Sequence, residues 1–322
     1  VEEIKTRLQT RLSQGVHRPG DKFPSAREVA ARFGISYQTA HRILRELHDE
    51  GLLERRAASG TFIPGGAQFF DGAHLIFDGR ARREDSFGGR LVEKLSRRLE
   101  RDGIKFRLDF SDALSLKIRR GFFPVLWESP RFVESCLKAN RPAILLNDRP
   151  APGLSATFLD SVSIDDFSGG AGAAQLLFRA NENGKNWAIV GGLEGDVRSQ
   201  MRVAGAQSVL KNASVLSAGG WYFEDGYRVA PQVLGAGGDG IFCANDRLAH
   251  AISTFAREEN RKLPTIVGFD DAPIAEKIGL TTMAIPWDEL IFEAAQIIKK
   301  RMNGDNAGAR QLILTPRPIV RN

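Results

Sequence analysis

The sequence "FPSAREVAARFGISYQTAHRILRELHDEGLLERRAASGTFI", residues 23–63, decides the fold of the N-terminal part of this chain. Ser25 and Glu28 stand three positions apart, as in a capping box, so a helix is expected to begin here. Gly34 is the residue type that commonly ends a helix in a left-handed conformation. This stretch therefore predicts a short helix followed by a tight turn. Its inward-facing residues are expected to be Val29, Ala30 and Phe33.

A second helix is predicted directly after this turn. Ser36 is placed to cap it, and Gly51 stands where a left-handed residue would end it. Its apolar stripe consists of Ala40, Ile43, Leu44 and Leu47. Farther upstream, an earlier helix is predicted by Ile4, Leu8 and Leu12, which recur every four residues. This order is typical of a helix-turn-helix, in which the first turn of the second helix approaches DNA bases.

The first turn of that second helix is polar. Gln38 and Thr39 can hydrogen-bond base edges, and Tyr37 can stack or bind a phosphate. The alternative is a helix start that is only solvated. Two neighbouring features favour DNA binding: the flanking Arg27, Arg42 and Arg55, and the extended runs in "LLERRAASGTFI", which predict a two-stranded wing.

These residues also resemble a known family. The pattern "PGDKFPSAREVAARFGIS…EGLLERR…SGTFI" looks like the winged helix of the gluconate-repressor (GntR) family over residues 1–63. Members usually carry Arg where this chain has Tyr37, and often another where it has His41. The wing also departs from the usual Gly-Arg-Gly-Thr, with Ala58 and Ser59 before Gly60. The resemblance implies these DNA-binding residues: Arg27, Ser36, Tyr37, Gln38, Thr39, His41, Arg42, Gly60 and Thr61.

Charge and composition restrict the class of protein. The 322-residue chain has a net charge of +6. Residues 1–66 hold eleven Lys and Arg against eight Asp and Glu, whereas the remaining 256 residues hold 34 against 31. A basic N-terminal part favours a polyanionic partner, although a solvated basic surface would have the same charge. No apolar run of about 18 residues occurs, so no membrane span is expected.

Reactive residue types are sparse and scattered. Cys136 and Cys243 are the only cysteines, which fits a reducing cytoplasm and no disulfide framework. The five histidines have no Cys or carboxylate at metal-ligand spacing, so neither a metal nor another cofactor is expected. No nucleophile elbow or Ser-His-Asp constellation is recognisable. We therefore expect no enzyme activity.

The rest of the chain alternates between predicted strands and helices. A linker is expected at residues 64–72, followed by apolar runs such as "HLIFDG", "AILLND" and "PTIVGFDD", each leading to a helical pattern. The small residues of "SGGAGAA", residues 168–174, are expected to allow close packing of a helix on a sheet. Repeated strand-helix units indicate an α/β fold with parallel sheets covered on both faces. Some ten strands are too many for one compact lobe, so two lobes are expected.

Polar residues follow several predicted strands, at the edge where ligands of such sheets bind. The adjacent Asn147 and Asp148 follow "AILL", Asn245 follows "IFCA" and Asp270 follows "IVGF". With Arg202 and Trp221, they suit a polyhydroxylated ligand, since Arg donates parallel hydrogen bonds and Trp packs against a sugar ring. The alternative for each residue is structural. Trp221 can lie in a core, and acids such as Asp166 and Asp246 can cap helices.

A second resemblance covers residues 73–322. "GIFCANDRLAHAI…LPTIVGFDDAPIAEKIGLTTMAIPWDEL" and "SQMRVAGAQSVL" are similar to the effector-binding body of the lactose/galactose-repressor (LacI) family, which shares the periplasmic sugar-binding fold. It implies that Arg202, Asn245 and Asp270 contact an effector, with Trp221 and Asp148 as further pocket residues. Phe87, placed by pattern alone, can stack from the first helix of the body. The layout resembles that of the arabinose repressor.

Together the two resemblances imply a winged helix-turn-helix at residues 1–63 and a two-lobed, periplasmic-binding-protein-like (Rossmann-like) body at residues 73–322. Lobe one is expected at about 73–164 plus 287–310, and lobe two at about 165–282 plus 311–322. We expect a cytoplasmic homodimeric transcription repressor that binds double-stranded operator DNA and is controlled by a small carbohydrate effector. Two alternatives stay open: a nucleoside or purine effector, and a solute-sensing module whose head binds protein.

Overall fold

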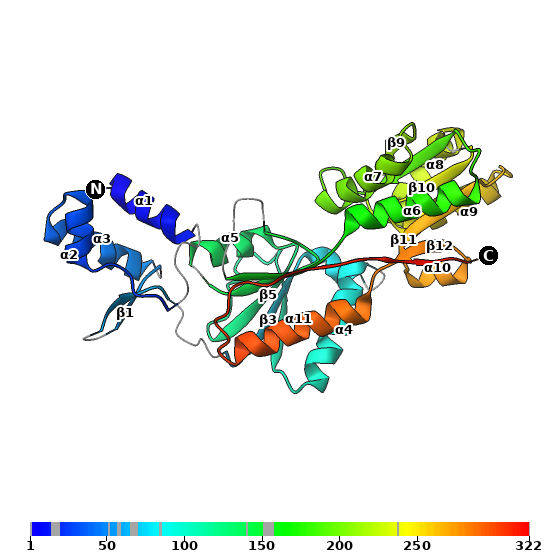
Figure 1. Ribbon diagram of the computed structural model, residues 1–322. Coiled ribbons are helices and arrows are strands. Elements are labelled where there is room, and N and C mark those ends of the chain that lie inside the picture. Colours follow the sequence, from blue (N-terminus) through cyan, green and yellow to red (C-terminus); the bar gives the residue numbers. More distant parts are fainter. Residues whose placement is uncertain are drawn as a thin grey trace. The chain divides into compact units, whose positions relative to one another are not determined.

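The protein is represented by a computed structural model that describes residues 2–13, 20–50, 52–56, 59–64, 70–83, 86–139, 141–150, 158–236 and 238–321. The chain divides into two compact units. Unit 1 comprises Val1–Ser163 and Asp288–Leu312, and unit 2 comprises Ile164–Trp287 and Ile313–Asn322. Unit 1 holds an N-terminal head and lobe one, and unit 2 is lobe two; Figure 1 labels their elements.

The head contains three helices and a small sheet. Its elements are α1 (Glu2–Ser13), α2 (Ala26–Phe33), α3 (Tyr37–Asp49), β1 (Glu54–Arg56) and β2 (Gly60–Phe62). The two strands pair antiparallel, so the predicted wing is confirmed. Both predicted helix signals are present: Ser25 and Glu28 form the capping box, and Gly34 closes α2 with a φ of 62°. The apolar stripes of the three helices meet in one core, which includes Leu8, Leu12, Val29, Ile43, Leu44 and Leu47.

Helix α3 ends directly before Gly51, the residue expected to stop it. The helix stops at Asp49, and Glu50 caps it in a right-handed conformation with its amide donating to the Glu46 carbonyl. Three expectations fall outside the described residues: the helix stop at Gly51, the wing residue Ala58, and linker residues 65–69.

Lobe one is built on a sheet in which β4, β3, β5, β6 and β7 are parallel neighbours in that order, with β13 beside β7. The strands are β3 (Gly72–Phe77), β4 (Phe106–Phe110), β5 (Phe122–Trp127), β6 (Ala143–Leu146), β7 (Leu159–Ile164) and β13 (Gln311–Leu314). The helical elements are η1 (Gly79–Arg82), α4 (Phe87–Arg101), α5 (Pro130–Lys138) and α11 (Trp287–Met302). Strands β3, β5, β6 and β7 are buried at every position, as their apolar runs predict for a covered parallel sheet.

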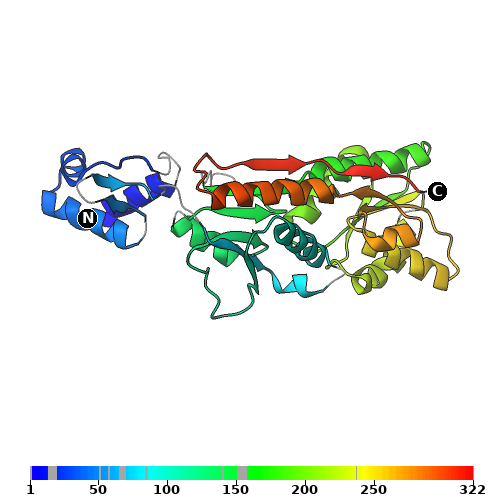
Figure 2. The same ribbon diagram turned by 90° about the horizontal axis from the view of Figure 1, so that it is seen from below.

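Lobe two has the same type of architecture. Its sheet runs β9-β8-β10-β11-β12-β14, parallel except for antiparallel β14. The strands are β8 (Trp187–Gly191), β9 (Ser214–Ser217), β10 (Gly240–Cys243), β11 (Thr265–Asp270), β12 (Thr281–Ala284) and β14 (Arg317–Ile319). The helices are α6 (Asp166–Ala180), α7 (Val197–Val209), α8 (Phe223–Ala236), α9 (Asp246–Glu258) and α10 (Pro273–Lys277). Helices α6 and α7 pack together, as do α8 and α9, and Figure 2 shows helices on both faces of this sheet.

The predicted α/β class is confirmed, and the short elements η1 and α10 are additions to the expected set.

One buried ion pair joins two parts of lobe one that are far apart in the sequence. Arg301 on α11 donates from Nε and Nη2 to both carboxylate oxygens of Asp160 on β7, at 2.7 and 2.8 Å. Among the described residues, no helix is long and apolar enough to cross a membrane.

Candidate functional site

The first turn of α3 presents polar side chains to solvent. The Ser36 hydroxyl accepts from the Thr39 amide at 3.1 Å, so Ser36 is used as the helix cap. Its oxygen also lies 2.8 Å from the Thr39 hydroxyl, which ties these two side chains together. Tyr37 is 53% exposed, and Gln38 is also exposed. Tyr37 and Gln38 are therefore the side chains of this turn that remain available to a partner.

The cations around this turn are exposed. Arg27 lies on the solvent side of α2, and the Arg42 side chain is 56% exposed beside Glu46. His41 lies between two neighbours: its ring centroid is 6.0 Å from that of Tyr37, and its Nε2 is 3.3 Å from Nη2 of Arg55. Arg55 is on wing strand β1, so His41 connects helix α3 to the wing.

The wing brings a further cation close to Gly60. Thr61 is paired with Arg55 across the two strands. Gly60 has a φ of 117°, which favours glycine, and an added Cβ there would lie 3.3 Å from Cε of Lys22. Lys22 also bridges to Phe62, so residues before α2 border the wing. Arg55 was named from the sequence as a flanking cation, whereas Lys22 was missed, because only the folded wing brings it near Gly60.

In lobe two, three predicted or neighbouring charges form one buried cluster. Arg202 on α7 donates from Nε to Asp166 Oδ1 at 2.8 Å and from Nη1 to Asp270 Oδ1 at 2.9 Å. Nη1 also donates to the Ala244 carbonyl at 2.7 Å. Asp166 and Asp270 are each 7% exposed and Arg202 is 3% exposed. The guanidinium is thus held at the carboxyl end of β11, where Asp270 ends the strand.

This arrangement depends on small residues in α6 and α7. An added Cβ at Gly170 would lie 2.0 Å from the Arg202 carbonyl oxygen, and one at Gly205 would lie 2.0 Å from that of Phe167. The two helices therefore approach closely only with glycine at both positions. The close approach places Arg202 next to Asp166.

Within "SGGAGAA", Gly170 serves this helix–helix contact, while Gly169 and Gly172 face the sheet: an added Cβ at Gly169 would lie 2.6 Å from the Phe269 ring on β11, and one at Gly172 would lie 3.0 Å from Cε of Met283 on β12. The close helix–sheet packing expected from the sequence is therefore confirmed.

Aromatic rings and an amide complete the lobe-two cluster. The guanidinium carbon of Arg202 lies 3.8 Å from the ring centroid of Phe269 and 5.8 Å from that of Trp221. Trp221 is partly exposed, and an added Cβ at Gly192 would lie 2.5 Å from its ring. Asn245 caps α9 by accepting from the Leu248 amide, and its Nδ2 donates to the Trp221 carbonyl. Asn245 therefore positions Trp221.

The charges of this cluster are strongly coupled. Burial opposes the charge of Arg202, but Asp270 and Asp166 outweigh it and raise its pKa above the ordinary value. Asp246, next to Asn245, accepts from the Ala272 amide and the Thr282 hydroxyl, both at 2.6 Å. Burial, with the nearby Asp270 charge, raises the pKa of Asp246 to about 8. Neither Asp166 nor Asp246 is the helix cap expected: Asp165 and Asn245 cap α6 and α9.

Lobe one has its own cluster at the carboxyl edge of its sheet. The ring of Phe87, at the start of α4, stacks on Trp127 with centroids 6.4 Å apart and planes at 23°. Trp127 ends β5 and is 3% exposed, and its indole Nε1 has no hydrogen-bond partner among the described residues. Asn147, directly after β6, is 4% exposed, and its Oδ1 also lacks a partner among the described residues. Buried polar atoms without a partner are rare in folded proteins, so this edge of the lobe-one sheet is a candidate ligand site.

Asp148, the predicted contact of this lobe, lies differently from its neighbour. It is exposed, and its Oδ1 accepts from the amide of Arg149. Asn147 has a φ of 50° and is the buried residue of the pair. Asn147 and Trp127 thus join the predicted Phe87 in lobe one, and Asp166 and Phe269 join Arg202, Trp221, Asn245 and Asp270 in lobe two. The sequence signal was the position after each strand, which does not say which of two adjacent polar residues turns inward.

The described residues contain no group of three or more His, Cys, Asp or Glu side chains that could hold a metal ion. Cys136 and Cys243 are buried. Burial raises the pKa of Cys136 to about 12 and that of Cys243 still further above its ordinary value, so both remain thiols at neutral pH.

Comparison with known proteins identifies two parts of the chain. Residues 1–63 match the family of bacterial regulatory proteins called the gntR family. Residues 131–278 match the family of periplasmic binding protein domains. The chain is 47% identical over 62 residues to the histidine utilization repressor of Klebsiella aerogenes, covering 19% of this chain and 26% of that protein. It is 26% identical over 167 residues to catabolite control protein A of Streptococcus mutans, covering 48% of this chain and 50% of that protein. The chain thus spans half or less of these relatives' lengths.

Solved structures share the fold over more of the chain. A complex of the transcriptional regulator CelR with cellobiose has a TM-score of 0.68 at 19% identity, covering 93% of this chain and 99% of that one. A LacI family transcriptional regulator from Enterococcus faecium with bound ribose has a TM-score of 0.66 at 22% identity, covering 77% of this chain and 97% of that one. The double resemblance inferred from the sequence is confirmed: a gntR-type winged helix precedes a periplasmic-binding-protein-like body.

Proposed function

We propose that this chain is a DNA-binding transcription repressor whose operator affinity is controlled by a small carbohydrate-type effector. The observation that carries the proposal is the first turn of α3, where Ser36 is used as the cap while Tyr37 and Gln38 are exposed. Exposed polar side chains at this position of a helix-turn-helix suit base readout in the major groove. The curated relatives matched over parts of the chain include repressors, which supports the same function.

Each part of the chain has its own proposed role. Residues 1–63 bind double-stranded operator DNA, and residues 64–72 link them to the body. Residues 73–322 bind the effector and form the homodimer, so that the cytoplasmic protein binds a pseudo-palindromic operator with two heads. The DNA contacts are Arg27, Ser36, Tyr37, Gln38, Thr39, His41, Arg42, Gly60 and Thr61. The protein acts by binding and has no catalytic role. The effector changes DNA affinity only if it binds two states of the protein with different affinities.

The effector contacts proposed in lobe two are Trp221 and the polar groups around it. Trp221 offers an apolar ring face, and Arg202, Asn245 and Asp270 lie next to it. In lobe one, Phe87 and Trp127 offer stacked rings, and Asn147 offers a buried acceptor, with Asp148 beside it. Rings beside hydrogen-bonding groups are the composition of a sugar site. They would also hold a nucleoside, so the ligand panel must include both classes.

The DNA part is tested with a labelled duplex from upstream of the protein's own gene, titrated at several salt concentrations. Gln38→Ala is expected to lower discrimination between this duplex and a scrambled one by about 1–3 kcal/mol, as for loss of a base contact. Arg27→Ala should weaken both duplexes alike and reduce the salt slope by about 1. Lys138→Ala, a change on exposed α5, is the control. Equal binding of all three variants to the operator duplex would refute DNA binding through α2 and α3.

The effector part is tested by thermal unfolding of the full chain against pentoses, hexoses, disaccharides and nucleosides. A ligand at 100 times its dissociation constant should stabilise the protein by about 2.7 kcal/mol. Release of the operator duplex by the same compound would link the two activities. A compound that stabilises the protein without changing operator binding would contradict the regulatory part of the proposal.

A further inference from the structure

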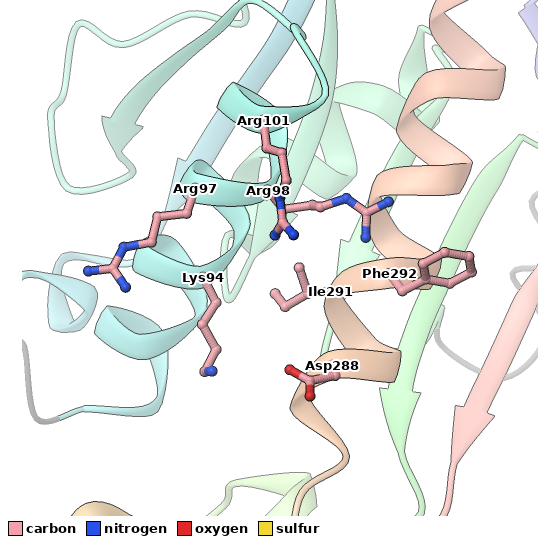
Figure 3. A pocket seen from close by; sticks show the side chains of 7 residues that line it. All are labelled: Lys94, Arg97, Arg98, Arg101, Asp288, Ile291 and Phe292. Atoms are coloured by element: carbon pink, nitrogen blue, oxygen red, sulfur yellow. The ribbon is translucent and has the colours of Figure 1, made fainter.

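Lobe one carries a groove of about 390 Å³ between α4 and α11. Figure 3 shows the side chains that line it: Lys94, Arg97, Arg98, Arg101, Asp288, Ile291 and Phe292. None of them is at the carboxyl end of a strand, and none belongs to the candidate effector residues. The groove is therefore a separate feature of lobe one.

Four cations line one side of the groove. Lys94, Arg97, Arg98 and Arg101 are spaced three and four residues apart, so they share one face of α4. Arg97 pairs with Glu93 at 2.8 Å, and Arg98 uses only its Nε for Asp102, also at 2.8 Å. Lys94 and Arg101 make no ion pair or side-chain hydrogen bond with another described residue. The terminal nitrogens of Arg98, with Lys94 and Arg101, are thus available to an anion.

The other side of the groove is contributed by α11. Ile291 is 7% exposed and provides an apolar wall, while Phe292 is 46% exposed and lies under the Arg98 guanidinium at 5.2 Å. Figure 3 shows Asp288 at the same end of the groove as Lys94, with the Arg98 and Arg101 side chains farther along. The lining therefore has a strongly cationic part, an apolar wall and a single carboxylate.

We propose that this groove is a second small-molecule site, which binds a phosphate ester with a hydroxylated body. Arginine pairs bind phosphate through parallel, charge-assisted hydrogen bonds, so Arg98 and Arg101 take the phosphate with Lys94 as an additional cation. Asp288 accepts a hydroxyl of the body, and Ile291 contacts its apolar face. The volume lies in the range of small-molecule pockets. The lining has four cations and one acid, and a dianionic phosphate offsets two of the three excess positive charges.

The proposal is tested by isothermal titration of the full chain with glycerol 3-phosphate, ribose 5-phosphate and glucose 6-phosphate. The double reversal Lys94→Glu/Arg101→Glu is expected to weaken the bound ester by about tenfold or more, as for loss of charge-assisted contacts. Lys138→Glu makes the same charge change on exposed α5 and should leave the affinity unchanged. Lys94→Gln/Arg101→Gln supplies a milder variant, and thermal unfolding of each variant verifies that it is folded.

A second comparison examines the hydroxylated body. Asp288→Asn is expected to weaken the ester several-fold while leaving inorganic phosphate unaffected, since only the ester has a hydroxyl for this carboxylate. Three results would overturn the proposal: no saturable binding of any of the three esters up to about 10 mM, unchanged affinity in both folded double variants, or inorganic phosphate binding as tightly as the best ester. These measurements need neither DNA nor the effector, so their outcome is independent of whether the proposed regulatory function is correct.

Discussion

Nη1 of Arg202 lies 2.9 Å from Oδ1 of Asp270, and both side chains are buried. The same guanidinium pairs with Asp166, so one cation compensates two buried carboxylates. A buried charge without a partner is costly, whereas a buried pair can be close to neutral in stability. Arg202 therefore has a structural task in lobe two whether or not an effector is present.

Arg202→Ala is expected to destabilise lobe two by about 3–5 kcal/mol, because it leaves Asp166 and Asp270 buried without a cation. Hydrogen exchange of the β10 and β11 amides measures the stability of this lobe separately from that of the rest of the chain. Arg228→Ala is the matched control, since the Arg228 side chain is 65% exposed in its pair with Asp225, and should change stability by less than about 1 kcal/mol. Similar exchange rates in the two variants would show that the buried cluster contributes no more to the stability of lobe two than an exposed ion pair does. A loss of effector binding in Arg202→Ala alone is thus no proof of ligand contact.

Asn147→Gly is the cleaner test of an effector contact. The φ of 50° at Asn147 suits glycine, and the Oδ1 atom has no partner among the described residues, so little stability should be lost. If Oδ1 accepts from the effector, affinity should fall by about tenfold, as for one buried hydrogen bond. Titration of the effector found in the ligand panel measures this. Unchanged affinity would remove Asn147 from the site and leave its buried oxygen without a functional explanation.

Asp246→Asn is expected to change how stability depends on pH. The pKa of Asp246 is raised to about 8 in the folded protein, from an ordinary value near 4. The folded state therefore holds this proton more tightly, so the contribution is complete below about pH 4 and is lost as pH rises towards 8. Asn is neutral and can keep the contacts to Ala272 and Thr282. Relative to wild type, the variant should gain stability steadily between about pH 5 and 8.

The control for this prediction is Asp239→Asn. The backbone amides of Asn186 and Lys185 lower the pKa of Asp239, so its contribution is present above its ordinary pKa and is lost only on acidification. Between about pH 5 and 8, this variant should differ in stability from wild type by a nearly constant amount. Urea unfolding across that range distinguishes the two. Parallel profiles for Asp246→Asn and wild type would mean that the Asp246 proton is not linked to folding.

Gly34→Ala is expected to destabilise the head by about 1–2 kcal/mol, because Gly34 is left-handed with a φ of 62°. No other atom lies within 4 Å of an added Cβ, so backbone strain is the only cost. Gly34→Asn should be milder, since Asn tolerates this conformation better. Hydrogen exchange in α2 and α3 measures both variants. Equal losses in the two would point to a cause other than backbone conformation.

Local features were predictable from the sequence for a physical reason. The capping box at Ser25, the cap at Ser36 and the turn at Gly34 depend on atoms within four residues of one another. The fully buried strands were visible as apolar runs for the same reason. The end of α3 at Asp49, with Glu50 as its cap, lies directly before the glycine from which the stop was predicted.

The site could be predicted only as a set of positions after strands. Asn147 and Asp148 are adjacent and both polar, and backbone geometry alone decides that Asn147 is buried while Asp148 is exposed. Asp166 read as a helix cap, because its charge partner is 36 residues away on another helix. Trp127 read as part of an apolar strand, since the sequence does not show that its indole nitrogen lacks an acceptor.

The sequence by itself determined the class of this protein: a basic winged helix followed by an α/β body with parallel sheets. Caps, turns and apolar periodicity act over a few residues, so they are readable along the chain. Only the tertiary structure decided which charges meet. Arg202 reaches Asp270 across 68 residues of sequence, and α4 and α11 line one groove although most of the chain lies between them. Such contacts arise from packing, where the desolvation of each charge depends on neighbours that the local sequence does not specify.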